Sequence, residues 1–427
     1  MTRSLIGRAM VALVDWSLRV FFALGGGRWY EKKYGKRYGS SGERKGVLAG
    51  GAKGLLWIYA RTAGEVQSAL PFIHCVRADS SLPCAVSFDD TAGLEMARSV
   101  LGLQVERIFY TPWAAPQYAE RILDNLSPRA YVVMECGGDS QIPVVNACAR
   151  RRIPVFLING MMTWERRMRR QRRLIVPFWR HFYAYFERIL VCSEQDRGNF
   201  IASGAPEEKV LVMGSCKHEA VLLRKERTDT ERWRHLRPED GPLVVAGCPH
   251  LEEVGTLLAA FKKVRERYPL ARLILAPRNP RQIPYLPMLM TQGFEVKLFS
   301  EIPVGASRWD IAVVDSMGIL FELYAAADSA FLGDSLVPLG GHNIFEPMVF
   351  GIQSTHGPFM DDFPDTPLMD SLGAAVQVQN AEDLAHAWIR IMRPGEKERV
   401  REAAQNYFAR LGSPAQRSWE IVREFLE

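Results

Sequence analysis

The sequence has few of the signatures that mark common protein classes. Seven cysteines are scattered over 427 residues, with no Cys-x-x-Cys pair and no histidine at ligand spacing, which argues against a disulfide framework and a zinc site. Buried thiols in a reducing compartment fit this pattern. A P-loop that ends in Gly-Lys-Ser/Thr and a Gly-x-Gly-x-x-Gly turn after a strand are both missing, so a P-loop nucleotidase and an NAD-dependent dehydrogenase are disfavoured. The histidines are too dispersed along the chain to indicate a metal triad.

Long uncharged apolar runs are missing as well. The N-terminal apolar stretch, residues 5–24, is interrupted by Arg8, Asp15 and Arg19, so it falls short of the ~20 residues that a membrane-spanning helix needs. On a helical period the three charged residues share one face. Apolar residues cover much of the remainder, namely Leu5, Ala12, Leu13, Trp16, Val20 and Phe21. This arrangement is typical of a helix that lies in the membrane interface.

Positive charge is concentrated near the N-terminus. The chain carries a net charge of +6, but residues 1–60 hold eleven Lys or Arg and three Asp or Glu, a net of +8, which leaves −2 for the remainder. A basic tract follows the apolar stretch and consists of Arg28, Lys32, Lys33, Lys36, Arg37, Arg44 and Lys45. Such tracts are attracted to an anionic leaflet. We therefore predict that residues 1–45 dock on a membrane surface; an ordinary surface helix followed by a solvated loop is the alternative. No nucleic-acid-binding motif is present, and no nucleic-acid partner is predicted.

Short apolar runs alternate with stretches of helical period from about residue 55 onward. In the first half we predict strands at 55–59, 84–88, 107–110, 130–134, 155–158 and 188–191, and helices at 64–75, 92–101, 117–126 and 196–203. The alternation restarts after a charged stretch, with strands at 243–246, 272–276, 311–314, 329–332 and near Gln353, and helices at 252–268, 319–326, 343–350 and within 381–427. Such alternation predicts right-handed βαβ units and parallel sheets.

The pattern predicts an α/β protein with two doubly wound domains. We expect a Rossmann-like N-terminal domain at 46–223, a linker at 224–241, and a Rossmann-like C-terminal domain at 242–427 that ends in helices. Open α/β sheets bind ligands beyond the carboxyl ends of their strands. Two such domains that face each other would place a ligand site in a central cleft.

Two segments carry the predicted chemistry. Glu65 follows a strand and opens a helix, where the positive end of the helix dipole favours its ionised form, and an ionised carboxylate can remove a proton from a hydroxyl nucleophile. A simple helix cap is the alternative for Glu65. In the second domain a glycine turn at 340–342 leads into a helix expected near Asn343, whose free N–H groups suit a phosphate, and Glu346 can accept hydrogen bonds from a ribose. The alternative there is a turn with a capping Asn and a solvated Glu.

A dense basic cluster lies in the first domain. It comprises Arg150, Arg151, Arg152, Arg166, Arg167, Arg169, Arg170, Arg172 and Arg173. Guanidinium groups match phosphate geometry, so we predict that Arg166, Arg167 and Arg170 contact the phosphates of a glycolipid acceptor or anionic head groups. A solvated helix face is the alternative. His250, at a predicted strand end, is interpreted either as a donor contact or as a hydrogen-bonded structural histidine.

Five short segments recur in a recognisable order. They are Ala63-Gly64-Glu65-Val66, Gly214-Ser215-Cys216-Lys217, Ala276-Pro277-Arg278-Asn279-Pro280, Val314-Asp315-Ser316-Met317-Gly318, and the segment from Gly340 to Glu346. In these segments the chain resembles the bacterial 3-deoxy-D-manno-oct-2-ulosonic acid (Kdo) transferases, and the similarity runs from the N-terminus to about Pro358. The last segment is the most diagnostic.

The resemblance implies both a fold and a reaction. It implies a GT-B fold, catalysis without a metal or cofactor, and inverting transfer of Kdo from CMP-Kdo to a lipid A precursor at the cytoplasmic face of the bacterial inner membrane. It makes Glu65 the general base and assigns Glu135 to the acceptor side. The residues that it implies for the nucleotide-sugar donor are Lys217, Arg278, Ser316, Met317, Gly318, Gly340, Gly341, His342, Asn343 and Glu346, to which the strand-end position of His250 adds that residue.

The chain departs from the family pattern in three places. Residues 134–141 keep only the opening Met-Glu of the usual Met-Glu-Thr-Glu-Leu-Trp-Pro-Asn, Met317-Gly318-Ile319 replaces Met-Gly-Glu, and Asn159-Gly160-Met161 replaces Asn-Ala-Arg. We therefore interpret the chain as a divergent member. The alternatives are a GT-B transferase or epimerase that uses another nucleotide sugar, and a non-catalytic paralogue that binds glycolipid. The sequence does not indicate an oligomeric state.

Overall fold

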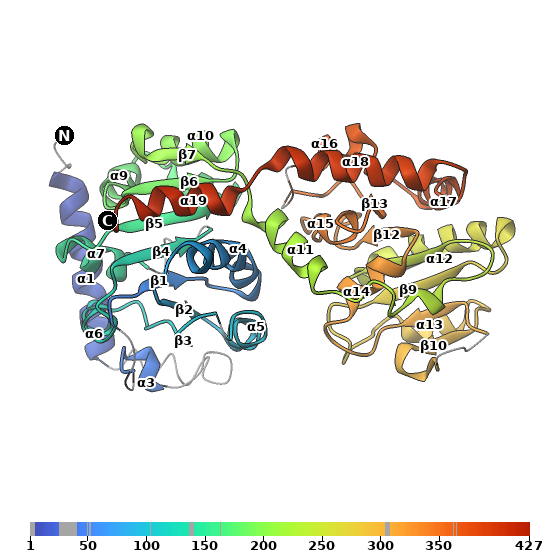
Figure 1. Ribbon diagram of the computed structural model, residues 1–427, viewed down its shortest axis with the longest axis horizontal. Coiled ribbons are helices and arrows are strands. Elements are labelled where there is room, and N and C mark those ends of the chain that lie inside the picture. The colour runs from blue at the N-terminus through green and yellow to red at the C-terminus, as the bar shows by residue number, and fades with distance from the viewer. Residues whose placement is uncertain are drawn as a thin grey trace. The chain divides into compact units, whose positions relative to one another are not determined.

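The chain folds into two α/β units, which are drawn in Figure 1. The computed structural model describes residues 5–24, 41–48, 50, 53–102, 104–135, 141–162, 164–303, 308–361, 363 and 365–427. The first unit contains Met1–Ala220 and Ser413–Glu427, and the second contains Val221–Gly412. Each unit is built on its own parallel sheet.

A seven-stranded sheet forms the centre of the first unit. Its strand order is β3-β2-β1-β4-β5-β6-β7, and every neighbouring pair is parallel. The strands are β1 (Leu56–Tyr59), β2 (Cys84–Phe88), β3 (Arg107–Tyr110), β4 (Ala130–Met134), β5 (Val155–Gly160), β6 (Arg188–Val191) and β7 (Val210–Val212). The strand order reverses between β1 and β4, and such a switch point is where open α/β sheets bind ligands.

Helices cover the sheet of the first unit. They are α1 (Leu5–Ala23), α3 (Ser41–Arg44), α4 (Ala63–Asp79), α5 (Thr91–Leu101), α6 (Pro116–Leu126), α7 (Ile142–Arg150), α8 (Trp164–Arg170), α9 (Val176–Tyr183), α10 (Glu194–Ala202), the start of α11 (Cys216–Glu226) and α19 (Pro414–Arg423). Strands such as β4, with the sequence AYVVM, are buried along their whole length, as expected for a parallel sheet that is covered on both faces. Trp57 and Tyr131 pack in this core with ring centroids 4.4 Å apart.

The second unit repeats the architecture. Its strand order is β10-β11-β9-β8-β12-β13-β14, again parallel throughout, with a switch point between β8 and β12. The strands are β8 (Leu243–Gly247), β9 (Arg272–Ala276), β10 (Val296–Leu298), β11 (Ile311–Val313), β12 (Ser329–Leu332), β13 (Gln353–His356) and β14 (Ala375–Gln377). The helices are α12 (Leu251–Arg267), α13 (Leu286–Met290), α14 (Leu320–Ala326), α15 (Phe345–Met348), α16 (Thr366–Leu372), α17 (Ala381–Arg390) and α18 (Glu396–Leu411).

The domain boundaries differ from those expected from the sequence. The C-terminal helix α19 was expected in the domain 242–427, but it belongs to the first unit. There Trp419 packs edge-on against Phe72 of α4 and donates a hydrogen bond to Asp79 (2.8 Å). The expected linker 224–241 is part of the second unit, because Leu236 is buried in its core and the Arg224 guanidinium stacks on Phe321. The charged composition of residues 224–241 suggested a solvated connection, but these residues pack against the second unit.

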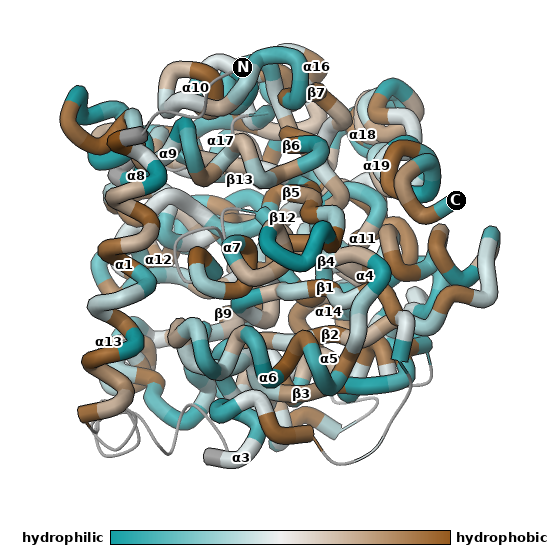
Figure 2. The backbone as a smooth tube through the Cα atoms, turned by 90° about the vertical axis from the view of Figure 1, so that its left-hand side faces the viewer, coloured by the Kyte–Doolittle hydropathy of each residue, from teal (hydrophilic) through white to brown (hydrophobic). Residues whose placement is uncertain are grey.

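The N-terminal helix α1 packs on α9 and α6 of the first unit. Hydrophobic and hydrophilic residues alternate along it, as Figure 2 shows. Among the described residues, no helix combines the length and the hydropathy that crossing a membrane requires. Of the predicted basic tract, Arg28 to Arg37 lie outside the described residues. Arg44 is buried, where it donates a hydrogen bond to the Thr111 carbonyl (2.7 Å), so it is not available to a membrane surface.

Candidate functional site

Acidic side chains follow both strands at the switch point of the first unit. Glu65 lies in the first turn of α4, after β1, and Glu135 directly follows β4. Thr62 caps α4 and accepts a hydrogen bond from the Glu65 backbone N–H (3.4 Å). A Thr N-cap with a Glu three residues later is a common helix start, because the Thr oxygen satisfies one of the free N–H groups. The local sequence therefore places Glu65 where ligands of such sheets bind.

The Glu65 carboxylate is buried, with 3% of the residue exposed, and faces Arg61. Its Oε2 accepts a hydrogen bond from the Arg61 backbone N–H (2.7 Å), and its Oε1 lies 3.6 Å from the Arg61 Nε. Burial, followed by the negative charge of Glu135, raises the pKa of Glu65 to about 8, and the contacts with Arg61 oppose this rise only in part. The helix dipole was expected to keep Glu65 ionised. This expectation is wrong for the folded chain without a ligand, because burial disfavours the charged carboxylate more strongly than the helix dipole favours it.

Glu135 is held by three polar side chains from other elements. Its Oε1 accepts hydrogen bonds from Ser68 Oγ (2.9 Å) and Asn159 Nδ2 (3.4 Å), and Lys217 Nζ lies 3.6 Å away. Lys217 was predicted among the donor residues, but the structure places it in the first unit beside Glu135. Residues 136–140, which carry the departure from the family motif, lie outside the described residues.

Asn159 is a site residue to which the sequence assigned no role. It lies one residue before the end of β5 and has a left-handed backbone (φ 56°), as Glu135 has after β4 (φ 54°). Such conformations are unfavourable for non-glycine residues and cluster at functional sites. The Asn159 Oδ1 also accepts a hydrogen bond from the Cys216 N–H (2.8 Å), which ties the start of α11 to the cluster. The signals in the sequence were a polar residue at a buried strand end and the Asn that the chain shares with the family's Asn-Ala-Arg segment.

The predicted arginines of α8 have different environments. Burial and the charges of Arg61 and Arg170 lower the pKa of Arg166 to about 10, whereas Glu65 favours its charged form. Arg167 is partly exposed. Arg170 is 1% exposed, donates a hydrogen bond to Tyr183 Oη (2.7 Å), and lies 4.3 Å from the Trp179 ring centroid. The prediction that Arg170 contacts an acceptor phosphate is therefore wrong, because this side chain packs in the core.

A buried carboxylate organises the switch point of the second unit. Glu253 of α12 is 1% exposed and accepts hydrogen bonds from the backbone N–H groups of His250 (2.7 Å), Asp334 (2.9 Å), Ser335 (2.9 Å) and Leu336 (2.8 Å). His250 Nδ1 in turn accepts a hydrogen bond from the Glu252 N–H (3.4 Å). His250 thus caps α12, which is the structural alternative for this residue. The sequence analysis missed Glu253, although a His-x-x-Glu capping pattern marks it.

Three predicted donor-side features meet around Asp334. This residue follows β12 with φ 57°, its Oδ2 lies 3.0 Å from His342 Nε2, and Arg278 approaches the same oxygen to 3.8 Å. Arg278 is otherwise exposed, so its guanidinium is accessible to a ligand. Gly340 and Gly341 also have left-handed backbones (φ 94° and 77°). A Cβ on Gly341 would collide with the Met360 sulfur, so the turn requires glycine there.

Asn343 and Glu346 follow this turn. Helix α15 begins at Phe345, later than the predicted Asn343, because the Asn343 Oδ1 accepts a hydrogen bond from the Phe345 N–H (3.1 Å) and caps the turn. Glu346 lies 3.3 Å from the Arg224 guanidinium. Burial raises the pKa of Glu346, and Arg224 opposes this rise.

The remaining predicted donor residues lie on an exposed loop. Ser316, Met317 and Gly318 follow β11, and Gly318 has φ 91°. Ile319, where the family carries a carboxylate, is the N-cap of α14 and makes no side-chain capping hydrogen bond. Within the described part of the chain, no group of three His, Cys, Asp or Glu residues is placed to hold a metal ion.

Comparisons with known proteins show which proteins the chain resembles. Residues 32–220 match a family model of 3-deoxy-D-manno-octulosonic-acid transferase (Kdo transferase). The chain is 25% identical over 410 residues to the 3-deoxy-D-manno-octulosonic acid transferase of Haemophilus influenzae, covering 93% of this chain and 92% of that protein. It is 23% identical to the enzyme of the same name from Chlamydophila psittaci, covering 93% and 90%.

The solved structures bear on the fold alone. The UDP-GlcNAc 2-epimerase of Neisseria meningitidis, in complex with UDP-GlcNAc, matches with a TM-score of 0.59 at 14% identity, covering 87% of this chain and 99% of that one. Together with the two parallel seven-stranded sheets, this likeness confirms the predicted two-domain α/β GT-B fold. The match to the family model over residues 32–220 and the near full-length relatives show that the chain is similar to Kdo transferases along most of its length.

Proposed function

We propose that this chain transfers Kdo from CMP-Kdo to a lipid A precursor, as a step in lipopolysaccharide synthesis. The names of its relatives support the donor sugar and the reaction class. The observation that carries the proposal is Glu65, a buried carboxylate at the switch point of the first unit whose pKa is raised to about 8. A general base is most effective when its pKa lies near the working pH.

Glu65 would act in a single displacement. The acceptor hydroxyl oxygen attacks the anomeric carbon of Kdo while its proton passes to the Glu65 carboxylate. The bond between the anomeric carbon and the phosphate oxygen breaks, and CMP departs with the electron pair, so that the configuration inverts. The negative charge of Glu65 favours the charged form of Arg166. Arg166 would therefore provide a cation for an acceptor phosphate beside Glu65. The step uses no metal and no cofactor.

The second unit would hold the nucleotide. Arg278 is accessible, and His342 lies on a glycine turn that permits close approach of the backbone. Both can stabilise negative charge as it develops on the departing phosphate. Glu346 is placed to hydrogen-bond the ribose hydroxyls. Asp334 and Glu253 would act as positioning residues, because they hold His342 and the loop after β12.

We further propose that α1 anchors the enzyme on the cytoplasmic face of the inner membrane. Three large apolar side chains of α1 are 63–65% exposed, namely Ile6, Leu13 and Trp16, and Leu24 directly after the helix is 83% exposed. They share the side of the helix opposite to Gly7, Val11 and Asp15, which are buried against the unit. An exposed apolar stripe with a tryptophan suits a helix that lies in the interface.

The test measures transfer from CMP-Kdo to a tetraacylated lipid A precursor in detergent micelles. We expect Glu65→Gln to lower kcat by about 10²–10⁴-fold, the usual range for loss of a general base, and to leave the KM for the donor unchanged. Glu95→Gln is a matched control, because Glu95 is an exposed carboxylate of α5. Wild-type turnover by Glu65→Gln would refute the base assignment. If the wild type forms no product, thermal shifts with CMP, UDP and GDP identify the nucleotide that stabilises the chain.

A further inference from the structure

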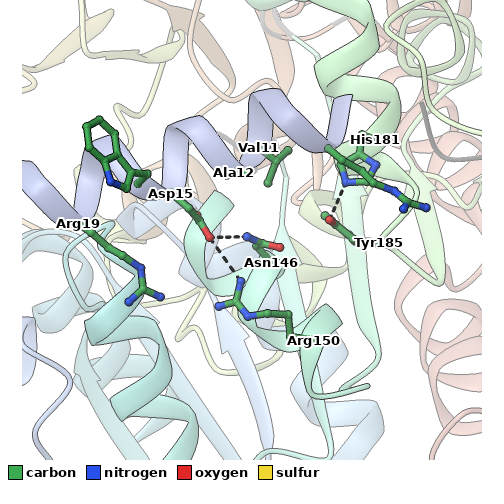
Figure 3. Close-up of a pocket in the computed structure, with 10 residues that line it drawn as sticks. Val11, Ala12, Asp15, Arg19, Asn146, Arg150, His181 and Tyr185 are labelled. Atoms are coloured by element: carbon green, nitrogen blue, oxygen red, sulfur yellow. Dashed lines mark hydrogen bonds and ion pairs between the residues drawn. The ribbon is translucent and has the colours of Figure 1, made fainter. Parts of the chain in front are cut away.

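A groove lined by both charged and apolar residues runs along one side of α1. Its volume is about 630 Å³, and Arg8, Asp15 and Arg19 of α1 line one wall. Asn146 and Arg150 of α7 contribute to the opposite wall, as Figure 3 shows. The residues that line this groove include none of the predicted donor or acceptor residues. We therefore consider the groove as a site of its own, apart from the predicted transfer residues.

The charges along the groove follow a definite order. Arg8 and Arg19 are separated by eleven positions, which corresponds to three helical turns or ~16 Å along the axis, and Asp15 lies between them on the same side. Neither arginine forms an ion pair with a carboxylate among the described residues. Arg150, in contrast, is paired with Asp15 (3.4 Å) and Glu120 (2.5 Å). The groove thus offers an unpaired cation toward each end and an acidic group between them.

Asp15 has one oxygen to offer a ligand. The residue is 8% exposed, and its Oδ2 accepts hydrogen bonds from Asn146 Nδ2 (2.5 Å) and Arg150 (3.4 Å). Its Oδ1 is buried and has no hydrogen-bond partner in the described part of the chain. A buried acceptor without a donor is unfavourable. A ligand with a hydroxyl or amino group at this point of the groove could donate the hydrogen bond that Asp15 Oδ1 lacks.

The groove also adjoins the exposed apolar stripe of α1. Trp16 lines the groove and is at the same time 63% exposed as part of that stripe. Tryptophan prefers the level of lipid head groups, where its ring is partly buried and its N–H stays polar. A groove beside such a residue would lie at headgroup depth when α1 is docked.

We propose that this groove binds the head group of a membrane phospholipid that carries two phosphates bridged by a hydroxyl-bearing linker. One phosphate contacts Arg8, the second contacts Arg19, and the hydroxyl donates its hydrogen bond to Asp15 Oδ1. The order cation, acceptor, cation along α1 matches the order phosphate, hydroxyl, phosphate in a glycerol-bridged bisphosphate. Basic pockets at membrane surfaces are known to suit such head groups. The inference rests on the membrane docking of α1 proposed above, but not on the transfer reaction.

The test compares vesicles of equal surface charge. Phosphatidylcholine vesicles contain either cardiolipin or twice that mole fraction of phosphatidylglycerol, and flotation measures the binding of the full-length chain. We expect the wild type to bind the cardiolipin vesicles about five- to tenfold more tightly, as two well-placed arginine contacts would give. Arg8→Gln/Arg19→Gln should lose this preference and bind both kinds of vesicle equally. Arg77→Gln/Arg98→Gln removes two exposed arginines of the same unit and should keep the preference.

Two results would overturn the proposal. The first is equal binding of the wild type to both kinds of vesicle, which would mean that α1 responds to surface charge alone. The second is a rise of the acceptor KM in detergent micelles for Arg8→Gln/Arg19→Gln, which would make the groove part of the acceptor site. Ile6→Ser/Leu13→Ser separates docking from headgroup binding, since both residues are exposed outside the groove and their loss should weaken binding to both kinds of vesicle alike. Flotation requires no turnover, so its outcome is independent of the proposed transfer reaction.

Discussion

Replacing Glu65 by glutamine is expected to stabilise the first unit at alkaline pH. Burial and the charge of Glu135 raise the pKa of Glu65 from 4.5 to about 8 in the folded chain. Below pH 4.5 the Glu65 carboxyl is protonated in both the folded and the unfolded chain. The contribution of the protonated Glu65 to the free energy of unfolding is then fully present. As the pH rises toward and through about 8, the unfolded chain has already released the proton, so that contribution is lost. Glutamine stays neutral throughout and avoids this loss.

The size of the effect follows from the two pKa values. The difference between 4.5 and about 8 corresponds to at most ~5 kcal/mol, at 1.36 kcal/mol per pKa unit. Glu65 and Glu135 interact, so only part of this energy belongs to Glu65 alone. Glutamine still accepts the Arg61 N–H hydrogen bond but loses the attraction to the Arg61 guanidinium. We therefore expect the stability difference between Glu65→Gln and the wild type to grow by about 2–4 kcal/mol from pH 5 to pH 9.

Urea unfolding at pH 5, 7 and 9 measures this difference, and hydrogen exchange of the α4 amides assigns it to the first unit. Glu95→Gln is the control, and its difference from the wild type should not change with pH. A difference that is constant across this range for Glu65→Gln would refute the argument. It would mean that Glu65 keeps an ordinary pKa in the folded chain, and the case for a base that works near pH 8 would fall with it.

Two further predictions concern the second unit. Glu253→Ala leaves four backbone N–H groups, two buried and two part-buried, without this acceptor. We therefore expect urea unfolding of this unit to show a loss of about 3–5 kcal/mol; a loss below ~1 kcal/mol would show that water replaces the carboxylate. Gly247→Ala places a Cβ against the Tyr324 hydroxyl and should lower the free energy of unfolding by about 2–4 kcal/mol. Gly255→Ala lies in α12, where a Cβ meets open space, and should raise the free energy of unfolding by about 0.5–1 kcal/mol. Equal effects of the two glycine substitutions in urea unfolding would contradict the packing at β8.

Much of the fold was predictable because it depends on local patterns. The strands 84–88, 107–110 and 130–134 coincide with β2, β3 and β4, since short β-rich apolar runs between helical stretches mark buried parallel strands. The strands β7, β10 and β14 were missed. Each has three residues, too few for an alternation or an apolar run to stand out from the neighbouring loops.

The site was only partly predictable. Thr62 and Glu65 are close in sequence, so the cap and the position of the carboxylate at a strand end followed from spacing. The raised pKa of Glu65 did not, because it depends on burial and on Glu135, which comes from another strand. Asn159 and Glu253 were missed for the same reason, since their partners lie on other elements.

The sequence by itself determined the strands of four or more residues and many of the helices, and that residues 5–24 are too interrupted by charge to span a membrane. The tertiary structure decided which way the charged side chains face. Asp15 is turned inward by Asn146 and Arg150 of α7, and Arg170 is buried against Trp179 and Tyr183 of α9. Helical periodicity shows which residues of a helix share a face, but burial and ion pairing depend on partners that are distant in the sequence. Only the folded chain brings these partners together.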